Sequence, residues 1–195
     1  MKIFSKMRVL FIFSLFFWGC GHSEEESIDY DQMAKTIMAK HKGPIGYEEI
    51  SNALTAVAGR KLKKEKNLHP IGFGGQGNEV LALDFFYYQM VDVKEARELL
   101  VYAVNEFLKI INNNEDVKPY LYNCPFTAQN ISTAIYFYLP NRGDVAPEKL
   151  TIIASDEGKV KFYNRGPDGR LFVFHRETFD EAEQIVKNES HSPIE

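Results

Sequence analysis

The chain of 195 residues is poor in cysteine and has no excess of positive charge. Its two cysteines, Cys20 and Cys124, are too few for a disulfide-rich scaffold or a four-cysteine zinc site. The formal net charge of −4 argues against a general nucleic-acid-binding protein. The five histidines form no i, i+4 pair and no H-E-x-x-H motif, so the pattern supports no metal site.

What the chain does contain is ordinary globular composition, with 45% hydrophobic and 26% charged residues. Such a composition excludes wholesale disorder and low-complexity scaffolds. The length suits one domain, and we expect it over residues 28–187, followed by a polar tail at 188–195.

The N-terminus has the pattern of an export signal. Lys2, Lys6 and Arg8 precede an uncharged and almost wholly apolar run of ten residues, 9–18. A helix of that length rises only about 15 Å, whereas the apolar core of a bilayer needs about 20 residues. Residues 1–20 are therefore predicted to be a signal peptide rather than a transmembrane helix.

The end of this run, Phe17-Trp18-Gly19-Cys20, resembles the lipobox of bacterial lipoproteins, in which a small residue precedes the lipid-carrying cysteine. The resemblance implies that Cys20 is acylated and becomes the new N-terminus, so the chain would carry a membrane anchor. Cleavage by an ordinary signal peptidase is the alternative, but its small-x-small rule is poorly met near Trp18.

The residues after Cys20 indicate a tether and a destination. Residues 21–27 are polar and acidic with no apolar periodicity, as in a solvated linker. Gly21 replaces the aspartate that implies inner-membrane retention in such lipoproteins, which favours the outer membrane. Farther along, residues 91–138, with Glu-Ala-Arg-Glu-Leu-Leu and Asn-Cys-Pro-Phe-Thr, faintly resemble uncharacterised small bacterial lipoproteins, a resemblance that implies no activity.

The remaining pattern predicts an α+β fold with a mainly antiparallel sheet of four to five strands. A long amphipathic helix should pack on this sheet, with two helices before it and a short helix at the C-terminal end. The expected helices are 29–41, 47–64, 93–111 and 179–187, and the expected strands are 79–91, 130–139, 149–155, 159–164 and 171–175.

Two of these helices carry a capping-box spacing at their start. Asp92 and Glu95 precede the apolar face of the long helix, and Thr178 and Glu181 precede the last helix. Both faces of strand 79–91 are largely apolar, so we expect a central strand covered on both sides. Asp84 is the exception, and it needs either a partner near a strand end or a position facing a cleft.

Gly72, Gly74 and Gly77 spell G-x-G-x-x-G, but in the wrong context for a nucleotide site. The dinucleotide motif needs a strand before it and a helix after it, whereas here a helix precedes and a strand follows. We expect no cofactor, and we interpret this segment as a flexible connector, with a mobile loop over a ligand site as the alternative.

Cys124 is the one thiol left if Cys20 is acylated, and with His175 it could form a nucleophile pair. No helix N-terminus is predicted near it to lower the thiol pKa, so we expect a buried structural cysteine. Asp156, Glu157 and Asp168 lie in predicted turns, and a catalytic carboxylate pair needs a separation that a sequence does not reveal.

Aromatic residues are in surplus on two predicted strands, at 85–88 and 136–138. If these strands are neighbours, Tyr88, Tyr136 and Tyr138 contribute to an aromatic face that would bind a peptide, glycan or partner protein. The alternative is ordinary core and edge packing.

These patterns favour a lipid-anchored envelope lipoprotein that acts as a binding or structural module, with no catalytic residues assigned. The alternative is an extracytoplasmic hydrolase that uses Cys124 or a carboxylate pair. A third hypothesis is a host-facing adhesin, because Arg142-Gly143-Asp144 is an adhesion-like tripeptide that also suits an ordinary turn.

Overall fold

The computed structural model describes residues 46–190. The predicted signal peptide (1–20) with Cys20, the tether (21–27) and the helix at 29–41 lie outside the described residues. The elements in chain order are α2 (Tyr47–Lys66), β1 (His69–Gln76), β2 (Val80–Tyr87), α3 (Val93–Asn112), the 3-10 turns η1 (Lys118–Tyr120) and η2 (Ala128–Asn130), β3 (Ile131–Phe137), β4 (Leu150–Asp156), β5 (Lys159–Arg165), β6 (Leu171–Thr178) and α4 (Phe179–Ser190).

The fold is α+β, as predicted, but its sheet differs from the expectation. Six strands lie side by side in chain order, from β1 to β6. β2 and β3 are parallel and the other neighbours are antiparallel, so the expectation of four to five mainly antiparallel strands was wrong in strand number and missed the parallel pair. A parallel pair needs a long crossover connection, which α3 provides.

The extra strand is β1, which occupies the glycine-rich segment that was expected to be a connector. The sequence pattern does not indicate this strand, because β1 lacks the alternation of apolar and polar residues that is typical of a half-buried strand. Pairing with β2 uses backbone groups alone, which glycine supplies as well as any residue. At Gly75 a Cβ would lie 2.2 Å from the carbonyl oxygen of Val80, so this close approach of the hairpin requires glycine.

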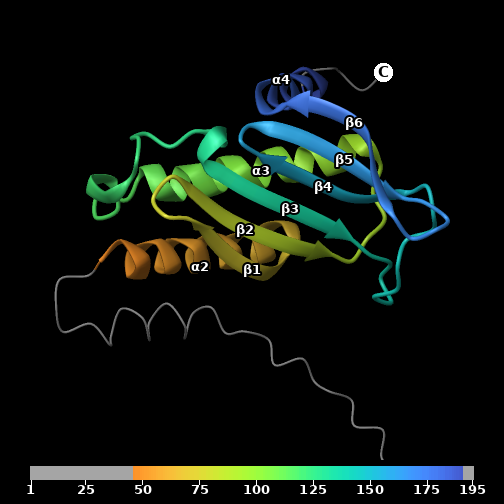
Figure 1. Ribbon diagram of the computed structural model, residues 1–195, viewed down its shortest axis with the longest axis horizontal. Helices are drawn as coiled ribbons and strands as arrows, with labels where there is room; N and C mark the ends of the chain where they lie inside the picture. Colours follow the sequence, from red (N-terminus) through yellow and green to blue (C-terminus); the bar gives the residue numbers. More distant parts are fainter. Residues whose placement is uncertain (1–45, 191–195) are drawn as a thin grey trace, which may run out of the picture.

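The helices pack on one face of the sheet. α2 contacts β1 and β2, α3 contacts β3 and β4, and α4 contacts β5, β6 and α3. The face beneath them carries the buried strand residues Leu81, Leu83, Phe85, Ile131, Ile135, Phe137, Ile153, Val160 and Phe162. Figure 1 views the sheet with α3 running behind it.

The opposite face, called here the open face, is covered by none of the helices within residues 46–190. The prediction that both sides of strand 79–91 are covered was therefore wrong, since in β2 the residues alternate between buried and half-buried. The connections β1–β2, β4–β5 and β5–β6 are short hairpins, and the one helical crossover, α3, lies on the helix face. Chain geometry thus leaves the open face bare in this part of the molecule.

Both predicted capping boxes are confirmed. The backbone N–H of Glu95 donates to Asp92 Oδ1 at 2.8 Å, and the N–H of Asp92 donates back to Glu95 Oε2 at 3.0 Å. At α4 the N–H of Thr178 donates to Glu181 Oε2 at 2.7 Å. α4 continues to Ser190, three residues beyond its predicted end.

A buried ion pair ties the long helix to the last strand. Arg97 of α3 donates from Nε to Glu177 Oε1 at 2.7 Å and from Nη2 to Oε2 at 3.0 Å, and the two side chains are only 10% and 5% exposed. Burial opposes ionisation of Glu177, but hydrogen bonds from Arg97 and His175 outweigh it and lower the pKa of the carboxyl.

We predict that Arg97→Met lowers the free energy of unfolding at pH 7 by about 3–5 kcal/mol, because it leaves the buried Glu177 without its guanidinium partner and with only the hydrogen bond to His175. Urea unfolding measures this loss. Arg170→Met is the control, because the Arg170 side chain is 88% exposed, and its free energy of unfolding should stay within about 0.5 kcal/mol of the wild-type value.

The effect of the ion pair should also depend on pH. A lowered pKa means that the stabilisation is present above the ordinary glutamate value of about 4.3 and is lost as pH falls through the folded value. The difference in free energy of unfolding between wild type and Arg97→Met should therefore become smaller below about pH 4.3. An equal difference at pH 7 and pH 3 would contradict this assignment.

Candidate functional site

One row of side chains crosses all six strands on the open face. Residues directly opposite each other on paired strands share a face, so the register can be followed from edge to edge. This row, called here the aromatic belt, consists of His69, Phe86, Tyr136, Ile152, Tyr163 and Val173. With neighbouring strands about 4.8 Å apart, the belt is roughly 24 Å long.

The rings at the β2–β3 end of the belt are packed around Phe86. The centroid of its ring lies 6.2 Å from that of Tyr88, 6.0 Å from Tyr136 and 5.2 Å from Tyr138, each in edge-to-face geometry. The three predicted tyrosines are thus brought together, and all three are half-buried. Edge-to-face pairs contribute about 0.5–1.5 kcal/mol each, so the rings are held in place before any ligand arrives.

The sequence prediction did not separate the two faces of these strands. Phe85, Tyr87 and Phe137 lie on the helix face, where Phe85 and Phe137 are 1% exposed, and they belong to the core. Core packing therefore accounts for three of the seven aromatic residues at 85–88 and 136–138, and the other four lie on the open face, namely Phe86, Tyr88, Tyr136 and Tyr138.

Beside the belt runs a second row with small residues at its centre. This small-residue row consists of Gly72, Asp84, Ala134, Ala154, Lys161 and Arg176. It lies two residues from the belt on β2 to β5, about 6.8 Å, and three residues from it on β1 and β6, where the pairing has a register shift. A Cβ built at Gly72 would have no atom within 4 Å, so open space lies above that end of the row.

Asp84 stands inside this row, and its partner is on the neighbouring strand. The backbone N–H of Ala134 donates to Asp84 Oδ1 at 2.8 Å, in the middle of the β2–β3 ladder. Burial raises the pKa of Asp84, and this hydrogen bond offsets part of the rise. Asp84 is thus held by the sheet itself and leaves its second oxygen for a further donor.

Burial and the charge of Asp84 both raise the pKa of Tyr136. The Tyr136 hydroxyl therefore stays protonated at neutral pH and can donate a hydrogen bond. The belt thereby combines ring surface with polar tips, which is the combination that makes tyrosine frequent in binding sites.

At the other end of the small-residue row two cations face each other. Lys161 of β5 and Arg176 of β6 are directly opposite in the register. Among the ion pairs within residues 46–190, none involves either side chain. Like charges directly opposite on a sheet destabilise it, so this pair costs stability in the free protein.

The loop between β3 and β4 borders the belt. The Arg142 guanidinium lies 5.4 Å from the centroid of the Tyr88 ring, a cation–π distance. Arg165 Nη1 lies 3.8 Å from Asp144 Oδ2, which fixes the loop against β5. The Arg-Gly-Asp tripeptide is therefore part of the border of the belt.

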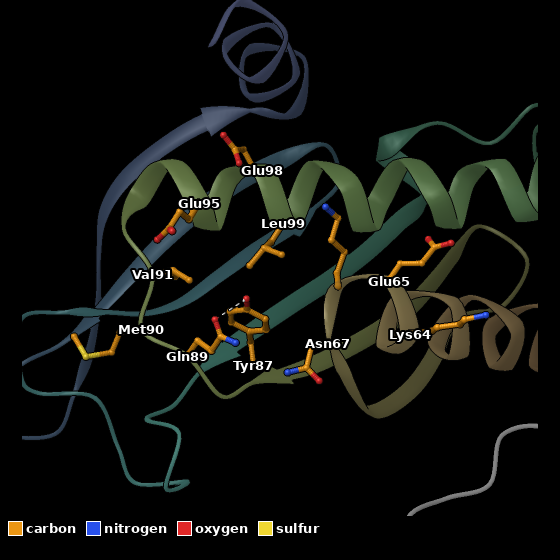
Figure 2. Close-up of a pocket in the computed structure, with 11 residues that line it drawn as sticks. Lys64, Glu65, Asn67, Tyr87, Gln89, Met90, Val91, Glu95, Glu98 and Leu99 are labelled. Atoms are coloured by element: carbon orange, nitrogen blue, oxygen red, sulfur yellow. Dashed lines mark hydrogen bonds between the residues drawn. The ribbon is translucent and has the colours of Figure 1, made fainter. Parts of the chain in front are cut away.

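A separate cavity of about 430 Å³ lies on the helix side, between the end of α2, the β2–α3 loop and the start of α3. Figure 2 shows Tyr87 and Gln89 facing each other there, joined by a hydrogen bond of 3.3 Å. In the same view Glu98 points away from Tyr87, on the far side of α3.

Two of the three acids that line this cavity, Glu65 and Glu95, already have structural partners. Glu95 caps α3, and Glu65 accepts a hydrogen bond of 2.5 Å from the hydroxyl of Tyr102. This bond raises the pKa of Tyr102 to about 12 and lowers that of Glu65. The cavity therefore offers helix-packing groups rather than a convergent catalytic set. In residues 46–190 no cluster of three His, Cys, Asp or Glu side chains could hold a metal ion.

The prediction that Cys124 is buried was wrong, because its side chain is exposed. The loop between η1 and η2 buries Leu121 and Phe126, and the turn between these two anchors directs Cys124 outward. His175 lies on β6, where its Nε2 is 2.8 Å from Glu177 Oε2. Within the described chain no hydrogen bond joins Cys124 to His175, so the hypothetical nucleophile pair is not assembled.

A comparison with family models, curated proteins and solved structures finds no match. None of the helices in the described range combines the length and apolar character needed to cross a bilayer. The function therefore has to be argued from the open face itself.

We predict that Lys161→Gln raises the free energy of unfolding by about 0.2–1 kcal/mol, because it removes one of two cations that lie opposite each other. Urea unfolding at low salt measures the gain, which should shrink at 1 M salt. Lys109→Gln on α3, where the lysine lies 3.9 Å from Glu106, is the control and should give no gain. A destabilised Lys161→Gln protein would contradict the unpaired arrangement.

Proposed function

We propose that this protein is a lipid-anchored envelope lipoprotein, of the outer membrane rather than the inner, that binds a ligand through the aromatic belt on its open sheet face. The observation that carries the proposal is the continuous row from His69 to Val173 across all six strands. Four half-buried rings in this row, on a face that no helix in residues 46–190 covers, form a surface that a ligand can complete: His69, Phe86, Tyr136 and Tyr163.

The chemistry of the belt supports binding more than catalysis. Its tyrosines present ring surface and hydroxyls, and the half-buried Asp84 lies beside them. A nucleophile with an adjacent base would be needed for hydrolysis. Cys124 and His175, the candidates for those roles, lie on separate elements, each with its own surroundings.

The anchor belongs to the same proposal. Cys20 would hold the protein at the membrane, and the acidic segment 21–27 would keep the domain away from the surface. A module of this kind connects a membrane to something in front of it, which fits a ligand-binding face better than a soluble enzyme.

The anchor is tested by Cys20→Ser. We predict that the wild-type protein incorporates labelled fatty acid and stays with membranes at 1 M salt, whereas the variant incorporates none and is released. Cleavage would also remove Trp18, the chain's one tryptophan, so the mature protein should show no tryptophan fluorescence. A variant that stays membrane-bound and lipid-labelled would contradict the anchor.

The binding face is tested with the lipid-free Cys20→Ser variant, by co-sedimentation with purified envelope fragments of the cell that produces the protein. We predict that Tyr136→Ala and Tyr163→Ala each raise the apparent Kd at least about tenfold, which is about 1.4 kcal/mol. Tyr122→Ala is the matched control, because Tyr122 is 71% exposed and lies in the loop that carries Cys124. Equal binding by all three variants, with melting temperatures unchanged, would refute a role of the belt.

A further inference from the structure

The charges of the open face are distributed unevenly. On β5 the residues of this face are Lys159, Lys161, Tyr163 and Arg165, and Arg176 of β6 lies beside them. The chain as a whole has a net charge of −4. An anionic ligand would thus meet a local cluster of cations on a protein that otherwise repels it.

The pair formed by Lys161 and Arg176 is the centre of this cluster. Arg165 has Asp144 within 3.8 Å, and Lys159 has Glu157 within 3.3 Å, whereas Lys161 and Arg176 take part in no ion pair within residues 46–190. Two opposed cations are an arrangement that an anionic group between them would stabilise.

The cation pair and the belt are close enough to hold one ligand. Tyr163 lies two residues from Lys161 on β5, about 6.8 Å along the strand. Between the cations and Asp84 the row contains only Ala154 and Ala134, so no large side chain separates the two ends. A ligand lying across the strands would touch rings on one side and charges on the other.

We propose that the open face binds an anionic oligosaccharide, with sugar rings against Tyr136 and Tyr163 and acidic groups at Lys161 and Arg176. This inference rests on the proposed function and adds the class of ligand. The ligand's hydroxyls match the Tyr136 hydroxyl and the free oxygen of Asp84, while the C–H faces of its sugar rings match the tyrosine rings.

The geometry favours a glycan over the two other anionic polymers. An extended peptide gains most by pairing with a sheet edge, whereas the belt crosses the middle of the sheet, perpendicular to the strands. Single-stranded nucleic acid needs a positively charged groove that follows its backbone, whereas the small-residue row has its cations, Lys161 and Arg176, at one end and the carboxyl group of Asp84 farther along.

The test is calorimetric titration of the full lipoprotein in detergent with oligogalacturonate, a uronic acid oligomer. Its methyl ester, which keeps the backbone and lacks the charge, is the matched ligand control. We expect the acid form to bind and the ester to bind at least about tenfold more weakly. The affinity for the acid form should fall as salt is added, since salt screens charge interactions.

Variants locate the interaction. Lys161→Gln with Arg176→Gln should weaken binding of the acid form at least about tenfold, whereas Lys161→Arg should bind like wild type. Lys94→Gln with Lys109→Gln removes the same charge from α3, on the other side of the sheet, and should change the affinity less than about twofold.

Each other outcome overturns the inference. No binding of the acid form, equal binding of the ester, or an equal loss in the α3 control would each exclude an anionic glycan at this pair. If a single-stranded oligonucleotide or an acidic peptide binds more tightly than oligogalacturonate, the site belongs to a protein that binds another class of ligand. If Tyr136→Ala still loses binding in the co-sedimentation assay with envelope fragments, the proposed function stands in all of these cases.

Discussion

Everything distinctive in this molecule depends on the sheet being covered from one side. The one parallel pair, β2 and β3, forces a crossover, and that crossover is α3 on the helix face. Hairpins make three of the other connections, and a hairpin places nothing across a sheet. α2 and α4 join α3 on the same face, so no helix within residues 46–190 covers the other face.

The bare face is ordered nevertheless. Phe86 is the centre of a ring cluster that fixes Tyr88, Tyr136 and Tyr138, and Asp84 is held by the backbone of β3. A ligand would therefore meet groups already in position, which lowers the entropic cost of binding. The opposed Lys161 and Arg176 cost stability without an evident structural return, as is common at functional sites.

Part of this could be predicted from the sequence, because some signals are local. The alternation in residues 131–137 predicts that Ile135 and Tyr136 lie on opposite faces of a strand, as they do, and the capping boxes at Asp92 and Thr178 indicate two helix starts. These patterns depend on neighbours only a few residues apart. Tyr88, Tyr136 and Tyr138 could be proposed together on the condition that the two aromatic strands are neighbours, and the pairing of β2 with β3 meets that condition.

The rest depends on register between distant segments, which no local pattern contains. Strand β1 has glycines where side chains would have revealed its alternation. The membership of His69 and Tyr163 in one row follows from four successive strand pairings, and a slip of one residue in any of them would move a side chain to the other face. The prediction for Cys124 was wrong because its loop buries Leu121 and Phe126 instead.

The central claim is that the open face is the surface through which this protein acts. Hydroxyl-radical footprinting of the tyrosines tests it most directly, in the free protein and in the protein bound to envelope fragments of the cell that produces it. The account predicts that Tyr136 and Tyr163 react in the free protein and become protected on the envelope, while Tyr122 reacts equally in both. Protection of Tyr122 or of Tyr102 on α3, with Tyr136 and Tyr163 unchanged, would contradict it.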